Sequence, residues 1–345
     1  MRPHDDFSLF VAFARIGGRC AGASDTVPDM HDVTNTKRTR RPRFRRASEP
    51  PAFRVTDDDV VILRLLARHR FLRSTHISAL VDRSLDRTND RLCRLFHAGY
   101  IDRPRAQLDY YPTAGSAPMV YALADLGASL LNERDRTQPS KIEWSGKNRE
   151  AGRPFIEHQL EIVGFEVALE LAVRPRTDVR LIHSDELIAR FPVQTRAMRN
   201  PLAIRATVSR DGETCEVAVI PDLIFGIAFP DGSRKCFMVE IDRGTMPLNR
   251  SDLRQTSFER KMRSYLAVHA AHQHVQQFGW KTFRVLTVTT DPHRARSMTE
   301  MLRRLHAPKS PGPALFLFAW CELLRTSDPI AFAWQDGNGR EVRLI

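Results

Sequence analysis

Two short apolar runs in the last third of the chain constrain its fold most, because each is long enough for one buried strand. They are 283–289 (FRVLTVT) and 314–320 (ALFLFAW), rich in β-branched and aromatic residues. A strand buried on both faces needs helices on either side of its sheet. Helical patterns lie at 156–172, 250–278 and 292–306, and further strands are expected at 179–183, 203–209, 214–227 and 235–242, with a terminal hairpin at 330–345. Residues 155–345 are therefore predicted to form an α/β domain with a mixed sheet.

The charge of the chain is unevenly distributed. Lys and Arg number 53 against 41 Asp and Glu, and the net charge of +12 favours a polyanionic partner. More than half of this excess lies in 37–54, where eight basic residues accompany one acidic residue and three prolines. Residues 1–54 are predicted to be a disordered basic arm whose Arg41, Arg43 and Arg45 contact DNA phosphates. A solubilising tail is the alternative.

Other features argue against several classes of protein. No run of 18 or more apolar residues is present, so a membrane span is not expected. The five cysteines are scattered and form no C-x-x-C pair, which favours a reducing cytoplasmic compartment over a disulfide scaffold. No glycine-rich phosphate loop supports ATP use. The three histidines His269, His272 and His274 are interpreted as a hydrated helix end.

Residues 55–135 show the element order of a winged helix-turn-helix domain. Thr56 is expected to cap a first helix and Ser84 a third, with a second short helix between them. Two strands follow, at 100–105 and 119–123. Three helices followed by a β-hairpin complete the order of this DNA-binding domain.

The third helix of this domain carries a stripe of basic residues. Arg83, Arg87, Arg91 and Arg94 are spaced four, four and three apart and share one outer face. Arginine pairs with phosphate or reads guanine edges, and Asn89 on the same helix can read adenine. We therefore expect this helix to bind double-stranded DNA. The alternative is a solvated, salt-bridged surface, because three aspartates, Asp82, Asp86 and Asp90, run beside the arginines at the same spacing.

Acidic residues gather on two neighbouring strands of the second domain, after a polar stretch at 136–154 that is predicted to be a linker. Pro221-Asp222 lies in one strand, and Glu240-Ile241-Asp242 ends the next. Alternation directs Glu240 and Asp242 to the same face, and the adjacent strand can bring Asp222 beside them. Converging carboxylates repel one another unless a cation intervenes, and Mg²⁺ prefers oxygen ligands. The sequence therefore predicts a magnesium site here.

This arrangement resembles the core of the PD-(D/E)xK nucleases. In that core two acids hold Mg²⁺, and a lysine two residues after the second acid helps to activate water. Asp242 stands where the lysine would be. Lys261, with Tyr265 one turn later, can supply the amine from the following helix, as in some divergent members of that superfamily. The resemblance implies a restriction-endonuclease-like domain at 155–345 with Mg²⁺ as its cofactor.

More specifically, the chain resembles the replication-relaxation family of plasmids and other mobile elements, over about residues 57–290. The matching stretches are 95–103 (LFHAGYIDR), 158–161 (HQLE), 221–224 (PDLI), 239–245 (VEIDRGT) and 261–265 (KMRSY). The resemblance implies DNA processing, or its control, on a mobile replicon. It leaves open whether the nuclease-like core cleaves DNA.

On the catalytic interpretation, the residues of the second domain have separate roles. Asp222 and Glu240 bind Mg²⁺, with Asp242 as a third ligand or behind the ligands. Glu161 closes the site as a metal ligand from the first helix of the domain, with His158 one turn away. Lys261 stabilises the charged phosphate or orients the attacking water. The residues expected to be catalytic are Asp222, Glu240, Asp242 and Lys261.

Three functions follow, of which a Mg²⁺-dependent nicking endonuclease is the first. The second is a non-catalytic accessory protein with a degenerate nuclease fold, whose second domain is a DNA clamp or a dimerisation surface. In that alternative, Glu240 and Asp242 pair with Lys261, Arg243 and Arg254. The third is a transcriptional repressor. The sequence leaves a homodimer open.

Overall fold

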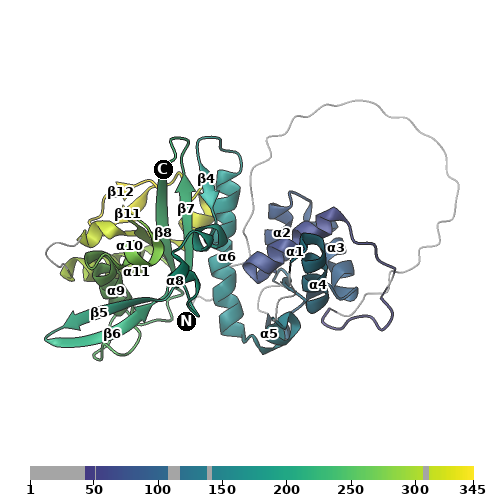
Figure 1. Ribbon diagram of the computed structural model, residues 1–345, viewed down its shortest axis with the longest axis horizontal. Coiled ribbons are helices and arrows are strands. Elements are labelled where there is room, and N and C mark those ends of the chain that lie inside the picture. The colour runs from purple at the N-terminus through teal and green to yellow at the C-terminus, as the bar shows by residue number, and fades with distance from the viewer. Residues whose placement is uncertain (1–42, 51, 108–116, 138–141, 306–310) are drawn as a thin grey trace. The chain divides into compact units, whose positions relative to one another are not determined.

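Two separate sets of elements make up the chain, divided after Ile156. The computed structural model describes residues 43–50, 52–107, 117–137, 142–305 and 311–345. Figure 1 shows the elements of each unit, coloured along the chain. Most of the predicted basic arm, including Arg41, lies outside the described residues. No described helix combines the length and the apolar composition needed to cross a membrane.

The first unit packs helices against a three-stranded antiparallel sheet of order β1-β3-β2. Its elements are α1 (Asp57–His69), β1 (Phe71–Arg73), α2 (Ser74–Leu80), α3 (Leu85–His97), β2 (Ile101–Asp102), β3 (Val120–Leu123), α4 (Asp125–Asp135) and α5 (Trp144–Glu150). The chain enters α1 at Thr56, whose backbone N–H donates to the Asp59 carboxylate at 2.7 Å. Leu63, Leu92 and Ile101 are fully buried, so α1, α3 and the sheet share one apolar core.

The sequence patterns of the first unit missed two elements. The three helices and the later strands of the predicted order are present, but β1 was not predicted, because three residues are too few to show alternation. Arg70, at a φ of 64°, turns the chain from α1 into β1. Helix α5 lies within the predicted linker at 136–154, where its polar composition concealed it. The buried side chain of Asn148 holds it by donating to the Leu123 carbonyl at 2.7 Å.

The second unit is built on a seven-stranded mixed sheet. From edge to edge its strands are β12 (Glu341–Val342), β11 (Trp334–Asp336), β10 (Phe316–Trp320), β9 (Arg284–Thr289), β8 (Arg234–Ile241), β7 (Leu223–Ala228) and β4 (Arg180–Ile182). Strands β8, β9 and β10 run parallel, and the other neighbours are antiparallel. The predicted α/β architecture with a mixed sheet is confirmed.

Helices cover both faces of this sheet. They are α6 (Arg153–Val173), which begins before the division, α7 (Ser184–Ala189), α8 (Val193–Arg196), α9 (Phe258–Ala270), α10 (Gln273–Phe278), α11 (Pro292–Arg304) and α12 (Cys321–Thr326). Met238 of β8 belongs to the core that includes Met262 of α9. Val239 belongs to the opposite core, which includes Phe165 of α6. Alternation along β8 therefore directs Glu240, like Met238, toward α9.

Two predictions for this unit are wrong in their boundaries. The predicted helix at 250–278 begins only after Ser257, whose Oγ accepts from the Arg260 N–H at 3.2 Å, and it breaks at His272, where φ is 53°. The predicted strand at 214–227 is two strands, β6 (Glu213–Val219) and β7, with Pro221 between them. Strand β6 pairs with β5 (Ile204–Arg210) in a hairpin outside the main sheet. Propensity alone does not show where a strand leaves its sheet.

Candidate phosphodiester site

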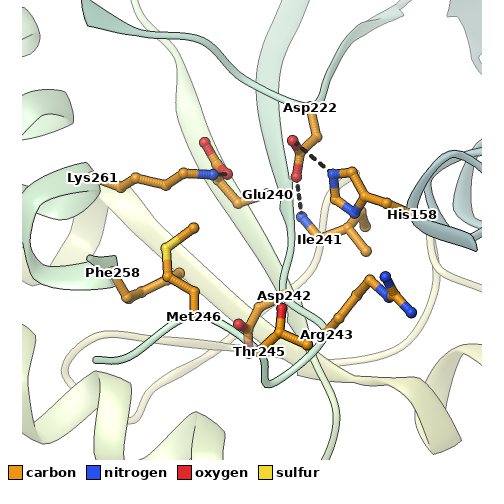
Figure 2. A pocket seen from close by; sticks show the side chains of 10 residues that line it. All are labelled: His158, Asp222, Glu240, Ile241, Asp242, Arg243, Thr245, Met246, Phe258 and Lys261. Atoms are coloured by element: carbon orange, nitrogen blue, oxygen red, sulfur yellow. Dashed lines mark hydrogen bonds and ion pairs between the residues drawn. The ribbon is translucent and has the colours of Figure 1, made fainter. Parts of the chain in front are cut away.

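The start of β7 and the end of β8 lie side by side, because the two strands are antiparallel with Leu223 opposite Val239. This register brings Asp222 next to Glu240. The Asp222 N–H donates to the Val239 carbonyl at 2.9 Å, and its Oδ2 accepts from the Ile241 N–H at 2.8 Å. Figure 2 shows the carboxylates facing one pocket, which has a volume of about 210 Å³.

Glu240 is the most deeply buried of the carboxylates that line the pocket, with 2% of its surface exposed. Tyr265 donates its hydroxyl to Oε1 at 2.5 Å, and the Lys261 ammonium pairs with Oε2. Burial raises the pKa of Glu240 to about 7, although Lys261 opposes the rise. Burial also raises the pKa of Tyr265 well above its ordinary value. Tyr265 is therefore a hydrogen-bond donor to Glu240 and not a phenolate.

Lys261 extends from α9 toward the start of β7 and the end of β8. Burial works against its charge, but the facing carboxylates, Glu240 before Asp222, outweigh that effect and raise its pKa. Its ammonium is therefore charged at neutral pH. An amine from α9 thus lies next to Glu240, whereas Asp242, two residues after Glu240 in the chain, is paired with Arg294.

Asp222 carries a second interaction, with a histidine of α6. His158 Nε2 lies 3.2 Å from Asp222 Oδ1, and this hydrogen bond raises the pKa of His158 although partial burial opposes the rise. Burial also acts against the charge of Asp222, but His158, Lys261 and the Ile241 N–H outweigh it and lower the pKa of Asp222. The two side chains form an ion pair when His158 is protonated, and the imidazole is 31% exposed and faces the pocket.

Asp242 is held on the side of the pocket away from Asp222. Arg294 of α11 donates to both of its oxygens, with Nε 2.5 Å from Oδ2 and Nη2 2.9 Å from Oδ1. Thr289 donates its hydroxyl to the same Oδ2 at 2.7 Å. Because the guanidinium already compensates its charge, Asp242 is a structural anchor of this rim.

Glu161 does not line the pocket. Its Oε1 accepts from Arg243 Nε at 3.2 Å, and Arg243 also reaches Glu157 at 2.6 Å. Burial raises the pKa of Glu161, and Arg243 moderates the rise. In this structure Glu161, which was predicted to be a ligand of Mg²⁺, is therefore paired with a guanidinium.

The donors of the pocket fit Mg²⁺ through two residues. Asp222 and Glu240 offer the hard oxygen ligands that this ion prefers, whereas Asp242 and Glu161 are bound to arginines. In the part of the chain that the structure describes, no group of three or more His, Cys, Asp or Glu side chains is arranged to hold a metal ion. Mg²⁺ commonly uses one or two carboxylates together with substrate phosphates. Asp222 and Glu240 are two such carboxylates, and in this structure they are paired with His158 and Lys261.

The arginine stripe predicted on α3 divides into two pairs. Arg91 pairs with Asp59, which is fully buried, and it donates to the Arg54 carbonyl at 2.9 Å. Arg83 pairs with Asp58 at 2.5 Å. Arg91 therefore joins α3 to α1, whereas Arg83 lies two residues before α3 and joins the preceding turn to α1. The other pair, Arg87 and Arg94, is exposed and forms no ion pair with any residue that the structure describes, while Asn89 is half-buried on the same helix.

The end of the basic arm packs on the first unit. Arg43 and Arg45 are exposed. Arg46, which the sequence analysis did not single out, donates to the Phe96 carbonyl at 3.0 Å and pairs with Asp102 at 2.8 Å. This residue holds the arm next to the end of α3. No local pattern distinguishes Arg46 from the arginines beside it.

A comparison with protein families identifies the chain. The family model described as replication-relaxation matches residues 63–286, which is more than half of the 345 residues and includes the pocket residues Asp222, Glu240 and Lys261. Comparisons with curated proteins and with solved structures found no match. This chain belongs to the replication-relaxation family.

Proposed function

We propose that this protein binds double-stranded DNA of a plasmid or mobile element, in the cytoplasm, and nicks it during replication or relaxation. Membership of the replication-relaxation family connects the chain with these processes. The observation that carries the proposal is the convergence of Asp222, Glu240, Lys261 and His158 on one pocket. Two carboxylates, an ammonium and a histidine can together hold a metal ion, stabilise phosphoryl charge and transfer a proton while water attacks phosphorus.

The first unit is proposed to be a winged helix-turn-helix domain. The order α1-β1-α2-α3-β2-β3, with antiparallel strands closing the unit, supports this assignment. Helix α3 then contacts DNA through Arg87, Arg94 and Asn89, since Arg83 and Arg91 are engaged with α1. The exposed Arg43 and Arg45 add contacts to phosphates from the arm.

The second unit is proposed to be a nuclease-like domain of the PD-(D/E)xK type. Asp222 and Glu240 would hold Mg²⁺, which when bound polarises the phosphodiester as a Lewis acid. Lys261 stabilises negative charge on the phosphoryl oxygens. The imidazolium of His158, oriented by Asp222, is placed to donate a proton to the leaving oxygen.

A second candidate function is a non-catalytic DNA-binding accessory protein. The observation in its favour is that each acidic group of the constellation already has a cationic partner. Glu240 pairs with Lys261, Asp222 with His158 and Asp242 with Arg294. Such a set is electrostatically balanced without a metal ion.

Nicking of supercoiled plasmid separates the two functions. The purified full chain is incubated with plasmid and Mg²⁺ or Mn²⁺, and open circles are counted on a gel, with EDTA as the blank. We expect nicking by the wild type and a loss of about 100-fold or more in Asp222→Asn. Asp178→Asn, which alters an exposed carboxylate of the same unit, should nick like the wild type. A wild type that binds DNA but nicks with neither ion establishes the accessory function instead.

A further inference from the structure

A basic loop borders one wall of the pocket. It connects β8 to α9, and two backbone hydrogen bonds close its base, from the Phe258 N–H to the Pro247 carbonyl at 3.1 Å and from the Glu259 N–H to the Leu248 carbonyl at 2.8 Å. Met246 and Phe258, on either side of this base, both line the pocket. Whatever binds the loop is therefore next to the pocket.

Charge accumulates in this loop and in the helical turn after it. Residues 249–263 hold five basic and two acidic side chains. Glu259 pairs with Arg210 and Arg263, and Lys261 faces Glu240. The other acid, Asp252, accepts from the Arg254 backbone N–H at 2.8 Å and forms no ion pair with a described residue. Three arginines remain, and none of them forms an ion pair with a described carboxylate: they are Arg250, Arg254 and Arg260. We call these three residues, two in the loop and Arg260 in the first turn of α9, the arginine loop.

Neutral acceptors hold two of these guanidiniums in place. Arg250 donates to the Thr256 carbonyl at 3.1 Å and to Gln255 Oε1 at 2.9 Å. Arg260 donates to the Arg254 carbonyl at 2.6 Å and to Thr256 Oγ1 at 2.7 Å. Carbonyl and hydroxyl acceptors leave the positive charge uncompensated, and a guanidinium has five N–H donors, so each keeps donors for a further acceptor.

The hairpin of β5 and β6 supports the loop from outside. Arg210, at the end of β5, donates to the Arg250 carbonyl at 2.6 Å and also to the Ser251 carbonyl. Its own guanidinium pairs with Glu259 and with Asp211. Arg210 is therefore a positioning residue. It fixes the backbone from which Arg250 extends and leaves that side chain exposed.

We propose that the arginine loop binds the phosphate backbone of DNA beside the strand that enters the pocket. This inference rests on the proposed DNA-processing function and adds a second contact surface, on the second unit. Fixed guanidiniums with full charge match phosphate oxygens in geometry and in sign. Their contact with the backbone carries no sequence information, so the loop contributes affinity and register, and sequence choice is left to α3.

The test measures DNA binding by the full chain as a function of salt, with a duplex of about 30 base pairs as the probe. The variant R250Q/R254Q/R260Q is compared with a matched control, R234Q/R304Q/R340Q, whose arginines are also exposed. The control residues lie at the opposite end of the strands, at the start of β8, the end of α11 and the turn after β11. The slope of log K against log salt is negative, and each lost phosphate contact reduces its magnitude by about 0.9.

For R250Q/R254Q/R260Q we expect affinity at least about tenfold weaker at roughly 0.1 M salt. The slope of log K against log salt should be less steep by about 2 to 3, while the control keeps the wild-type slope within about 1. Arg254→Glu guards against misfolding, because this guanidinium has no hydrogen bond to any described residue, and it should weaken binding by about tenfold alone. Wild-type binding by R250Q/R254Q/R260Q or by R254E, or an equal loss in the control, overturns the assignment. A wild type that fails to bind any duplex overturns the proposed function instead.

Discussion

At the scale of single residues, the pocket is governed by the pairing of each acid with one specific cation. The pair formed by His158 and Asp222 is the most accessible of these, and both of its pKa values move toward the charged forms. His158 has a raised pKa, so its contribution to stability is present below the ordinary histidine pKa and is lost as pH rises through the raised value. Asp222 has a lowered pKa and stays ionised over that whole range.

His158→Gln should therefore lower the free energy of unfolding at mildly acidic pH and have little effect in alkali. The expected cost is about 0.5–1 kcal/mol near pH 6, because the imidazole is partly exposed, and it should shrink toward zero near pH 9. Urea denaturation at the two pH values measures the difference. In an Asp222→Asn background the same substitution should show no such pH dependence, and a cost that grows with pH would contradict the pairing.

At the scale of elements, one arginine ties the end of β8 to α11 and to the loop between β8 and α9. Arg294 holds both oxygens of Asp242 and also donates to the Met246 carbonyl at 2.6 Å. Arg294→Ala leaves the carboxylate, which is 8% exposed, without its cation and should cost about 3 kcal/mol of unfolding free energy. Arg296→Ala, two residues along the same helix and exposed, should cost less than about 0.5 kcal/mol. Equal stability of the two variants in urea would show that Arg294 is no clamp.

Sequence patterns predicted elements whose signal is local and missed those defined by distant partners. Strands β9 and β10 were evident from their apolar runs, and the start of α1 from Thr56 and the acids after it. The proximity of Asp222 to Glu240 could be proposed because the strands follow each other along the chain. Arg294 gave no signal, since it lies 52 residues from Asp242, and no local periodicity encodes that contact.

At the scale of the whole molecule, the net charge of +12 describes the functional surfaces poorly. Many arginines are used inside the units, such as Arg91 with Asp59 and Arg243 with Glu161. Among the described residues, the cations left for a polyanion include Arg87 and Arg94 on α3 and the arginine loop of the second unit. Composition predicts a polyanionic partner, but only the ion pairs of the folded chain distinguish these arginines from the structural ones.

The two groups belong to separate units, so their contributions to DNA binding should add. R87Q/R94Q should reduce the magnitude of the slope of log K against log salt by about 2, and its combination with R250Q/R254Q/R260Q should reduce it by about 4 to 5. The slopes are measured by titration of the full chain with one duplex, with R234Q/R304Q/R340Q as the control for lost charge. A combined variant whose slope is as steep as that of either parent variant would show that the two units do not engage the same DNA molecule together.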